Sequence, residues 1–283
     1  MGSEMCIRDR FRPRGPYDLR RMRRDGLWRA ALPGGREAVA WQRHDGGVSV
    51  RATDAEGVER ARFMLALDAD HSGFHRAFAR DRLLGPSLRG LYGLRPLRTA
   101  TVAHALLRAA CGQLVSGSYA RQVEGSILRL AGSRAPVAAE LTRLSPAQLR
   151  ARGLATYRAS ALLRVLKGGD LERLHDVTSS VVIRRLGRER GFGPWSSGVV
   201  CLEGLGRFDH GKVGDLALIK LMSSLEGRWV EAAETAQLVA PYGEWRGLAV
   251  YYLMAGYAAG LVPGADRDGW REPRRRAAAV RAA

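Results

Sequence analysis

One acidic residue stands where a carboxylate could do chemistry. Asp215 directly precedes the apolar run Leu216–Leu221 and follows the glycine-containing loop Asp209–Gly214. An aspartate before an apolar run is by default the N-cap of a helix. A carboxylate held in such a position can also stabilise positive charge that develops during a reaction. Both interpretations predict a helix that starts at Asp215.

A glycine-rich turn lies about 20 positions before this carboxylate. A helix that ends near Leu186 is followed by Gly191–Ser196 (Gly-Phe-Gly-Pro-Trp-Ser), and a second helix is expected from Pro194. Two helices joined by a Gly-x-Gly turn form a hairpin, whose glycines let backbone N–H groups at a helix N-terminus approach an external anion. A duplex phosphate is the natural partner, and a plain tight turn is the alternative interpretation.

The hairpin, the spacing from Trp195 to Asp215 and the intervening loop together resemble a known pattern. They are similar to the helix-hairpin-helix DNA glycosylase superfamily, and most closely to its 3-methyladenine DNA glycosylase II branch. Gly112–Ser116 is similar to the segment that inserts a wedge side chain into DNA in this branch, and Tyr242–Gly247 is similar to its late helix start. The resemblance spans about residues 16 to 264. It implies a mainly α fold with an active-site cleft, preceded by a small α+β domain.

The resemblance implies a monofunctional DNA N-glycosylase that excises alkylated purines of the 3-methyladenine type from duplex DNA in base excision repair. Asp215 becomes the catalytic carboxylate, which acts after the base has been flipped out of the duplex. Leu114 becomes the wedge that fills the vacated stack. Trp195 stands where bifunctional relatives have the lysine that forms a Schiff base. Because an indole cannot form an imine, we expect base excision without strand cleavage.

Further site residues follow from the same resemblance. The implied base pocket consists of Trp195, Val199 and Met254. The implied contacts to the DNA backbone are Gly191, Phe192, Gly193, Ser196 and Lys212. The positions that hold a monovalent cation in the hairpin of this family correspond to the carbonyls of Gly187, Arg190 and Phe192.

Several residues depart from the family pattern. Arg190 replaces a common proline of the hairpin, and Gly211-Lys212 replaces a Phe-Pro pair in the loop. Val199 stands in place of a pocket tyrosine, and Met254 in place of a stacking tryptophan. The loss of two aromatic faces predicts a narrower or shifted set of lesions, or else a degraded pocket. The alternative function is therefore a helix-hairpin-helix protein that binds damaged DNA without catalysis.

The overall charge agrees with a polyanionic partner without identifying it. The 283 residues have a formal net charge of +18, and the 46 basic residues are all arginine except Lys167, Lys212 and Lys220. Guanidinium groups bind phosphates in a forked geometry, and phosphate contacts supply most of the nonspecific affinity for DNA. Codon bias explains part of the arginine excess, and an acidic membrane surface would attract the same charge.

Cysteine content and hydropathy restrict the class of protein further. Cys6, Cys111 and Cys201 are too few and too scattered for a zinc site or an iron–sulfur cluster, so we expect no required cofactor. The strongly apolar stretch Leu248–Val262 is shorter than the roughly 20 residues of a membrane helix and predicts a buried helix. No signal peptide is visible in residues 1–20. We expect a monomer in the bacterial cytoplasm, associated with the nucleoid, that binds double-stranded DNA and no membrane.

The chain divides into four segments. Residues 1–10 are interpreted as a non-native leader, because Met5–Arg10 equals the translation of a common sequencing adaptor. The other segments are a small α+β domain (11–95), a helical helix-hairpin-helix glycosylase domain (96–270) and a basic tail (271–283).

Local patterns predict the elements within these segments. In the first domain, Glu37–Trp41 and Val48–Arg51 flank a turn and predict a β-hairpin, followed by a helix at Glu56–Leu67. Beyond Pro96, nine segments carry apolar residues near a 3.6-residue period and predict helices, from Thr101–Val115 to Trp245–Leu261.

Overall fold

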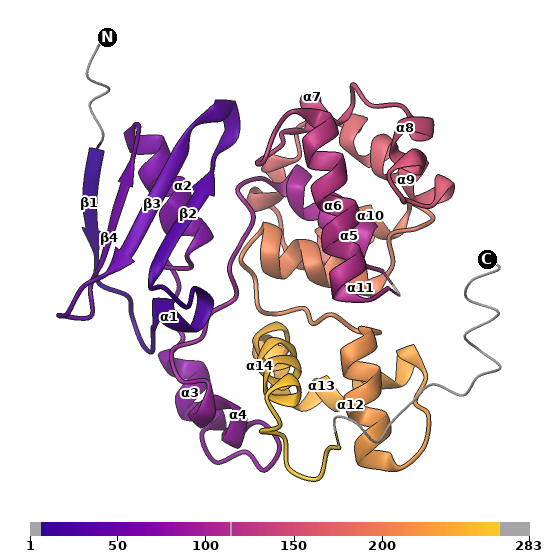
Figure 1. Ribbon diagram of the computed structural model, residues 1–283. Coiled ribbons are helices and arrows are strands. Elements are labelled where there is room, and N and C mark those ends of the chain that lie inside the picture. Colours follow the sequence, from indigo (N-terminus) through magenta and orange to yellow (C-terminus); the bar gives the residue numbers. More distant parts are fainter. Residues whose placement is uncertain (1–6, 114, 267–283) are drawn as a thin grey trace.

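A small antiparallel sheet lies beside two groups of helices (Figure 1). The computed structural model describes residues 7–113 and 115–266. The sheet has the order β1-β4-β3-β2, with every neighbouring pair antiparallel. Its strands are β1 Ile7–Phe11, β2 Leu27–Ala31, β3 Glu37–Gln42 and β4 Val48–Ala52. The helical elements of this region are α1 Leu19–Met22, η1 Pro33–Gly35 and α2 Ala55–Met64.

The predicted β-hairpin is confirmed as β3 and β4. Arg43 N donates to Gly47 O at 2.8 Å and closes the turn, in which Gly46 adopts a left-handed φ of 80°. Helix α2 follows directly, because the Asp54 side chain accepts a hydrogen bond from Gly57 N at 2.7 Å and caps the helix start. Its apolar face, which includes Val58, packs on the sheet in one buried cluster.

Residues 7–10, which the sequence assigns to a leader, form most of β1. This strand lies at the edge of the sheet and pairs with β4 from Ile7–Ala52 to Phe11–Val48. The side chains of residues 7–10 are exposed. Because backbone hydrogen bonds dominate such an edge pairing, almost any sequence without proline can make it. The strand therefore does not test whether residues 1–10 are a leader, which stays a prediction.

The first group of helices contains the predicted hairpin. Its elements are α5 Val102–Gly112, α6 Gly117–Ala131, α7 Ala138–Leu141, α8 Pro146–Ala151, α9 Thr156–Lys167, η2 Glu172–Asp176, α10 Ser179–Gly187, α11 Pro194–Val199 and the π-helical turn η3 Val200–Gly204. Leu106 of α5, Leu162 of α9 and Val182 of α10 are fully buried in their common core. The predicted helices of this part are confirmed, whereas the short elements α7 and η2 were not predicted.

The second group of helices joins segments that are far apart in the sequence. Its elements are α3 Ser72–Phe78, α4 Gly85–Gly90, α12 Leu216–Glu226, η4 Ala232–Glu234, α13 Thr235–Val239, η5 Ala240–Trp245 and α14 Arg246–Ala258. Phe74 of α3 and Leu88 of α4 are buried in one cluster with Leu218 of α12 and Tyr252 of α14. The packing therefore differs from the division at Pro96, because α3 and α4 bury their apolar faces against C-terminal helices rather than against the sheet.

Helix α14 corresponds to the buried helix that the apolar stretch predicts. Its residues Leu248, Val250 and Leu253 are fully buried. Within residues 7–113 and 115–266, none of the helices combines the length and the hydropathy that a membrane span requires.

A fully buried arginine connects the sheet region to the helices. The Arg95 guanidinium donates to the carbonyl oxygens of Pro16 at 3.0 Å, Ala66 at 2.6 Å and Ala69 at 2.9 Å, and also to that of Arg14. Ala66 has a φ of 54°, a left-handed conformation that alanine rarely adopts. Arg95 thus satisfies four carbonyls and holds a strained turn where the chain leaves the sheet region.

We predict that Arg95→Met lowers the free energy of unfolding by about 3 kcal/mol or more, because buried carbonyls lose their hydrogen-bond donor. Urea denaturation of both proteins measures the difference. Arg20→Met, at an exposed arginine of α1, serves as the matched control and should cost less than about 0.5 kcal/mol. A loss below about 1 kcal/mol for Arg95→Met would show that the guanidinium does not hold this junction.

Candidate active site

The helical hairpin forms where the sequence predicts it. Helix α10 ends at Gly187, and α11 starts with Pro194 in its first turn and Gly193 as its N-cap. Gly191 adopts a φ of 113°, which an L-residue rarely adopts, so the turn requires glycine at this position. The Phe192 side chain is buried in the helical core and anchors the turn from inside.

The carbonyls assigned to a monovalent cation are unused in this turn. Phe192 N donates to Glu189 O at 3.0 Å, and Glu189 N donates to Leu186 O at 3.0 Å. None of the hydrogen bonds described for the turn uses the carbonyl oxygens of Gly187, Arg190 or Phe192. These three acceptors therefore retain lone pairs that suit a cation.

Asp215 is the N-cap of α12, and both of its carboxylate oxygens are held. Its Oδ1 accepts from Ala217 N at 2.9 Å, which caps the helix. Its Oδ2 accepts from Trp195 Nε1 at 2.7 Å, so the indole of the hairpin helix orients the carboxylate. The N-cap interpretation is thus confirmed through Oδ1. The interpretation as a functional carboxylate stays a prediction.

Two glycines permit the close packing that brings these side chains together. A Cβ on Gly112, at the end of α5, would lie 2.8 Å from Cη2 of Trp195. A Cβ on Gly198 of α11 would lie 2.6 Å from Gly211 O in the loop before Asp215. Real Cβ atoms do not approach other atoms so closely, so a larger residue at either position would displace the indole or the loop.

A cavity of about 730 Å³ opens beside Asp215 and Trp195, between the two groups of helices. It brings together Trp195, Val199, Lys212, Asp215 and Met254, which the sequence assigns to the site. Its lining also includes residues of α5, α6, η3 and the segment between α5 and α6: Arg108, Gly112, Val115, Ser116, Gly117, Ala120, Arg121, Glu124 and Glu203. From α12 it includes Leu216, Ala217 and Lys220.

The predicted wedge, Leu114, lies outside the described residues. Its neighbours on both sides are described, and Gly112 and Val115 line the cavity. Gln113 O accepts from Arg158 Nη1 at 2.9 Å, which ties this segment to α9. The wedge assignment therefore stays a prediction for a residue whose neighbours border the cavity.

Three of the predicted contacts to the DNA backbone have side chains that face inward. Phe192 and Ser196 are buried, with exposed fractions of 3% and 1%. Their side chains cannot reach a phosphate, because the turn buries Phe192 in the helical core and α11 buries Ser196. The Lys212 ammonium donates to Glu203 Oε1 at 2.5 Å inside the cavity. Its position favours a role in the cavity over the expected phosphate contact. Gly191 and Gly193 remain partly exposed at the turn.

Sequence reasoning missed a network of paired charges that forms one wall of the cavity. Arg108 of α5 donates to Glu124 Oε1 of α6 at 3.1 Å and to Glu203 Oε2 of η3 at 2.8 Å. Lys212 donates to the other oxygen of Glu203, and His104 Nε2 lies 2.8 Å from Glu124 Oε1. We call Arg108, Glu124, Glu203 and Lys212 the charged wall. Its members are scattered over four segments, and no local pattern marks them as partners.

The wall keeps its carboxylates ionised. Burial raises the pKa of Glu203, but Lys212 and Arg108 outweigh burial and lower it to about 2, from an ordinary value of 4.5. Burial also raises the pKa of Glu124, while its hydrogen bonds to His104 and Arg108 lower it overall. Both carboxylates therefore accept hydrogen bonds and carry negative charge at neutral pH.

We predict that Glu203 makes stability depend on acid pH. Since its pKa is lower in the folded chain than in the unfolded one, its contribution is full above about pH 4.5 and is lost as the pH falls toward 2. Chemical denaturation at several pH values should show a weaker pH dependence for Glu203→Gln than for the wild type. Glu244→Gln, at an exposed glutamate, should keep the wild-type dependence. Identical slopes for Glu203→Gln and wild type would contradict the pairing.

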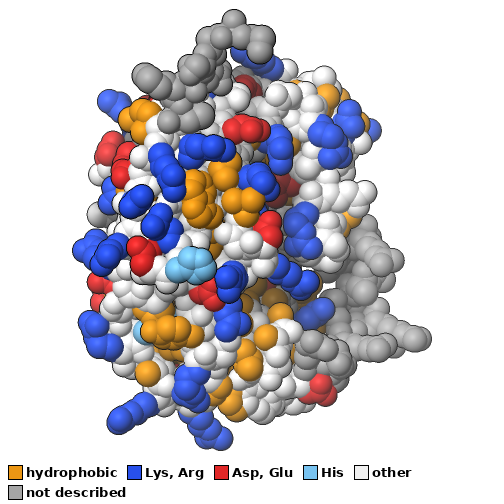
Figure 2. Space-filling view, turned by 60° about the vertical axis from the view of Figure 1, so that its left-hand side comes forward, with side chains coloured by type: hydrophobic (Ala, Val, Ile, Leu, Met, Phe, Trp, Pro, Cys, Tyr) orange, Lys and Arg blue, Asp and Glu red, His pale blue; other side chains and the backbone are white. Residues whose placement is uncertain are grey.

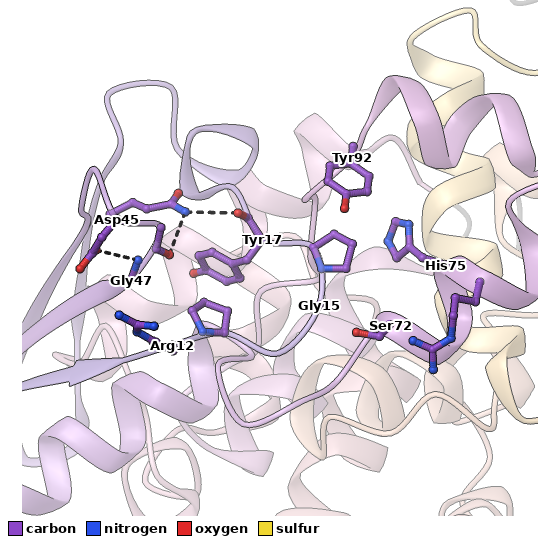
Figure 3. A pocket seen from close by; sticks show the side chains of 13 residues that line it. Arg12, Gly15, Tyr17, Asp45, Gly47, Ser72, His75 and Tyr92 are labelled. Atoms are coloured by element: carbon purple, nitrogen blue, oxygen red, sulfur yellow. Dashed lines mark hydrogen bonds between the residues drawn. The ribbon is translucent and has the colours of Figure 1, made fainter.

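A second cavity, of about 590 Å³, lies between the sheet region and α3 (Figure 3). The Gln42 side-chain amide donates there to Tyr17 O at 3.2 Å and to Gly46 O at 3.4 Å. The Asp45 carboxylate also lines this cavity and accepts from Gly47 N at 3.1 Å within its own turn. None of the site residues predicted from the sequence lines this cavity. We therefore place the candidate active site at Asp215.

The distribution of basic side chains bears on where an anion could bind. On the side of the molecule that carries the sheet, Figure 2 shows Lys and Arg side chains scattered among acidic and apolar ones. Beside the hairpin turn, Arg184, Arg188 and Arg190 are exposed and have no described side-chain partner. These three arginines are available to an anion near the turn.

Comparisons with known proteins identify the fold. No protein-family model and no curated protein matches the sequence. The structure is similar to that of a 3-methyladenine DNA glycosylase from Archaeoglobus fulgidus, with a TM-score of 0.76 and 17% identity over 89% of this chain and 98% of that one. It is also similar to an 8-oxoguanine glycosylase/lyase from Clostridium acetobutylicum, solved with double-stranded DNA, with a TM-score of 0.70 and 17% identity over 92% and 99% of the two chains.

A third similar structure covers a smaller share of this chain. It is a 3-methyladenine DNA glycosylase from Schizosaccharomyces pombe in complex with abasic DNA, with a TM-score of 0.55 and 16% identity over 64% of this chain and 92% of that one. The first two similarities extend over nearly the whole length of both chains and thus include the sheet region. The hairpin, the helical groups around it and the small α+β region together show that this chain has the helix-hairpin-helix DNA glycosylase fold.

Proposed function

We propose that the protein is a monofunctional DNA glycosylase that removes alkylated purine bases from duplex DNA. The observation that carries the proposal is the carboxylate of Asp215, which Trp195 orients at the border of a cavity next to the helical hairpin. The similar structures include two 3-methyladenine DNA glycosylases, and two of the three were solved with DNA. We further propose that it acts as a monomer on the DNA of the bacterial nucleoid.

The cavity supplies what cleavage of the glycosidic bond needs. A base inside a duplex must be flipped out before its glycosidic bond is accessible, at a cost of a few kcal/mol. An alkylated purine carries positive charge and leaves readily, so it requires no general acid. The sugar that remains resembles an oxocarbenium ion, which the carboxylate of Asp215 would stabilise while water attacks. Preorganised groups of this kind contribute on the order of 3 kcal/mol each.

The hairpin is proposed to hold the DNA backbone. The partly exposed Gly191 and Gly193 leave backbone groups of the turn accessible, and Arg184, Arg188 and Arg190 are exposed positive charges of α10 and the turn that follows it. The unused carbonyls of Gly187, Arg190 and Phe192 would hold a monovalent cation there. Such a cation would supply positive charge next to a phosphate. Leu114 would fill the space that the flipped base leaves.

Trp195 supports base excision without strand cleavage. Its indole lies against Asp215, at the place where a bifunctional enzyme needs an amine. Lys212 and Lys220 also line the cavity. Lys220 lies on α12 and not on the hairpin helix, and the Lys212 ammonium donates to the ionised Glu203 at 2.5 Å. An ammonium held by a carboxylate has no lone pair with which to attack C1′. The proposed enzyme therefore leaves an intact abasic site.

The alternative is a protein that binds damaged DNA without cleaving it. One observation favours it: Trp195 is the sole aromatic side chain among the described residues that line the cavity. Val199 and Met254 cover the positions where the family pattern has aromatic rings. A flipped base would then be stacked on one face only.

We predict that the protein releases free bases from methylated duplex DNA and leaves sites that break only after alkali treatment. Asp215→Asn should lower kcat by about 100-fold or more. Asparagine caps helices as well as aspartate does, so the free energy of unfolding should change by less than about 0.5 kcal/mol. Chromatography of released bases, gel analysis of the strand and urea denaturation measure these quantities.

The outcomes of this assay separate the two functions. Binding of alkylated and deaminated duplexes without release of any base would favour the non-catalytic protein. Strand breaks without alkali would contradict the monofunctional mechanism.

We predict that Trp195→Phe lowers kcat by about tenfold, because the Asp215 carboxylate loses the hydrogen bond that the indole N–H donates, while an aromatic ring is retained. The KM for methylated duplex DNA should change by less than twofold. Trp229→Phe, at a tryptophan outside the cavity lining, is the matched control. An unchanged kcat for Trp195→Phe would show that the indole does not orient the carboxylate.

A further inference from the structure

The charged wall has hydrogen-bonding capacity that its own pairs do not use. A guanidinium has five N–H donors and an ammonium has three. Arg108 uses its Nε and one hydrogen on each Nη, in bonds to Glu124 and Glu203. Lys212 uses one hydrogen, in its bond to Glu203. Two hydrogens of each cation therefore have no described partner.

Acceptors are scarcer on the same wall. Both oxygens of Glu203 accept hydrogen bonds, one from Arg108 and one from Lys212. Oε1 of Glu124 accepts from Arg108 and lies within hydrogen-bond distance of His104 Nε2, which leaves Oε2 as the carboxylate oxygen of the wall without a described partner. The wall therefore offers a molecule in the cavity mainly donors.

The wall can face the base while Asp215 faces the sugar. Asp215 comes from the start of α12, whereas Arg108, Glu124 and Glu203 come from α5, α6 and η3 in the other group of helices. A purine bonded to the sugar through N9 carries its C6 substituent on the part of the ring system far from that bond. The backbone of Lys212 adjoins Asp215, but its ammonium is held by Glu203 of η3 and so belongs to the wall. We expect a base with its sugar at Asp215 to direct its C6 edge toward Arg108 and this ammonium.

N–H donors of the wall that face the C6 edge of a base would distinguish two classes of purine. A 6-keto purine, such as a guanine derivative or hypoxanthine, presents the O6 acceptor together with an N1–H donor. A 6-amino purine presents an N–H donor at the same place, which would face the N–H donors of the wall. Lys and Arg contacts to guanine O6 and N7 are the commonest base-specific contacts of proteins.

We propose that Arg108 and Lys212 determine the substrate class of this site and select 6-keto purines over 6-amino purines. Within the alkylated purines this means 7-methylguanine rather than 3-methyladenine. Alkylation at N7 removes one acceptor of guanine but leaves O6. Two cations and two carboxylates give the wall no net charge, so it does not repel a cationic base, and Glu124 Oε2 suits the N1–H. The proposal rests on the function proposed above for the same cavity.

The first test compares released bases. Duplex DNA treated with dimethyl sulfate contains both 7-methylguanine and 3-methyladenine, and chromatography measures kcat/KM for each. Lys212→Met should lower the value for 7-methylguanine about tenfold or more, since a hydrogen bond from a charged donor is lost. The loss of the partner of Glu203 affects both bases alike, so the expected result is a fall of about fivefold or more in the ratio of the 7-methylguanine value to the 3-methyladenine value. Comparing variants by this ratio cancels the different intrinsic lability of the two bases.

Two control variants accompany this comparison. Lys167→Met removes the same charge at an exposed position outside the cavity lining and should keep the wild-type ratio. Lys212→Arg keeps donors toward the cavity and should retain the preference for 7-methylguanine. An equal loss for both bases in Lys212→Met, or no loss for either, would overturn the proposal.

The second test needs no variant and no catalysis. Hypoxanthine and adenine have nearly the same size and differ at C6 and N1, so quenching of tryptophan fluorescence by each free base probes the edge directly. Hypoxanthine should bind the wild-type protein about tenfold more tightly than adenine, and equal affinities would overturn the proposal. Selective binding without release of any base from DNA would instead reject the glycosylase function while supporting the selectivity of the wall.

Discussion

The hydrogen bond from the Trp195 indole to the Asp215 carboxylate is the interaction on which the site depends. It joins α11 of the first helical group to the start of α12 in the second group, and the cavity lies between these groups. The other oxygen of Asp215 caps α12, so the carboxylate has little freedom to rotate. Gly112 and Gly198 have no side chains where the indole and the loop approach, which is why this contact can form.

The charged wall imposes a second constraint. Charges placed next to a hydrophobic core cost free energy unless they are paired and hydrogen-bonded. Arg108 and Lys212 meet this condition by sharing Glu203, and Arg108 also holds Glu124. These pairs fix the side chains in place before any ligand arrives. Trp195 is the one aromatic side chain among the described residues that line the cavity, but the paired charges still present fixed polar groups to a ligand. The cavity therefore has fewer rings on which a base can stack without having a disordered lining.

The features that could be predicted from the sequence are those set by residues close together in the chain. The hairpin, the helix at Asp215 and the helices beyond Pro96 follow from glycines, caps and apolar periodicity, which act within a few residues. The inward orientation of Ser196 and the pairing of Lys212 could not be predicted, because both depend on how α11 packs. The same holds for α3 and α4, which a division at Pro96 assigns to the sheet region although they pack against α14.

The amino-acid sequence by itself determined the hairpin, the capping carboxylate at position 215 and the resemblance that connects them to a fold, because each depends on neighbouring residues or on their spacing. Only the tertiary structure decided what surrounds that carboxylate. Residues 108, 124, 203 and 212 come from separate segments, and their charges meet only when the helices pack. Residues that are so far apart in the sequence form no local pattern, because a buried charge pairs with the residue that lies next to it in the folded protein.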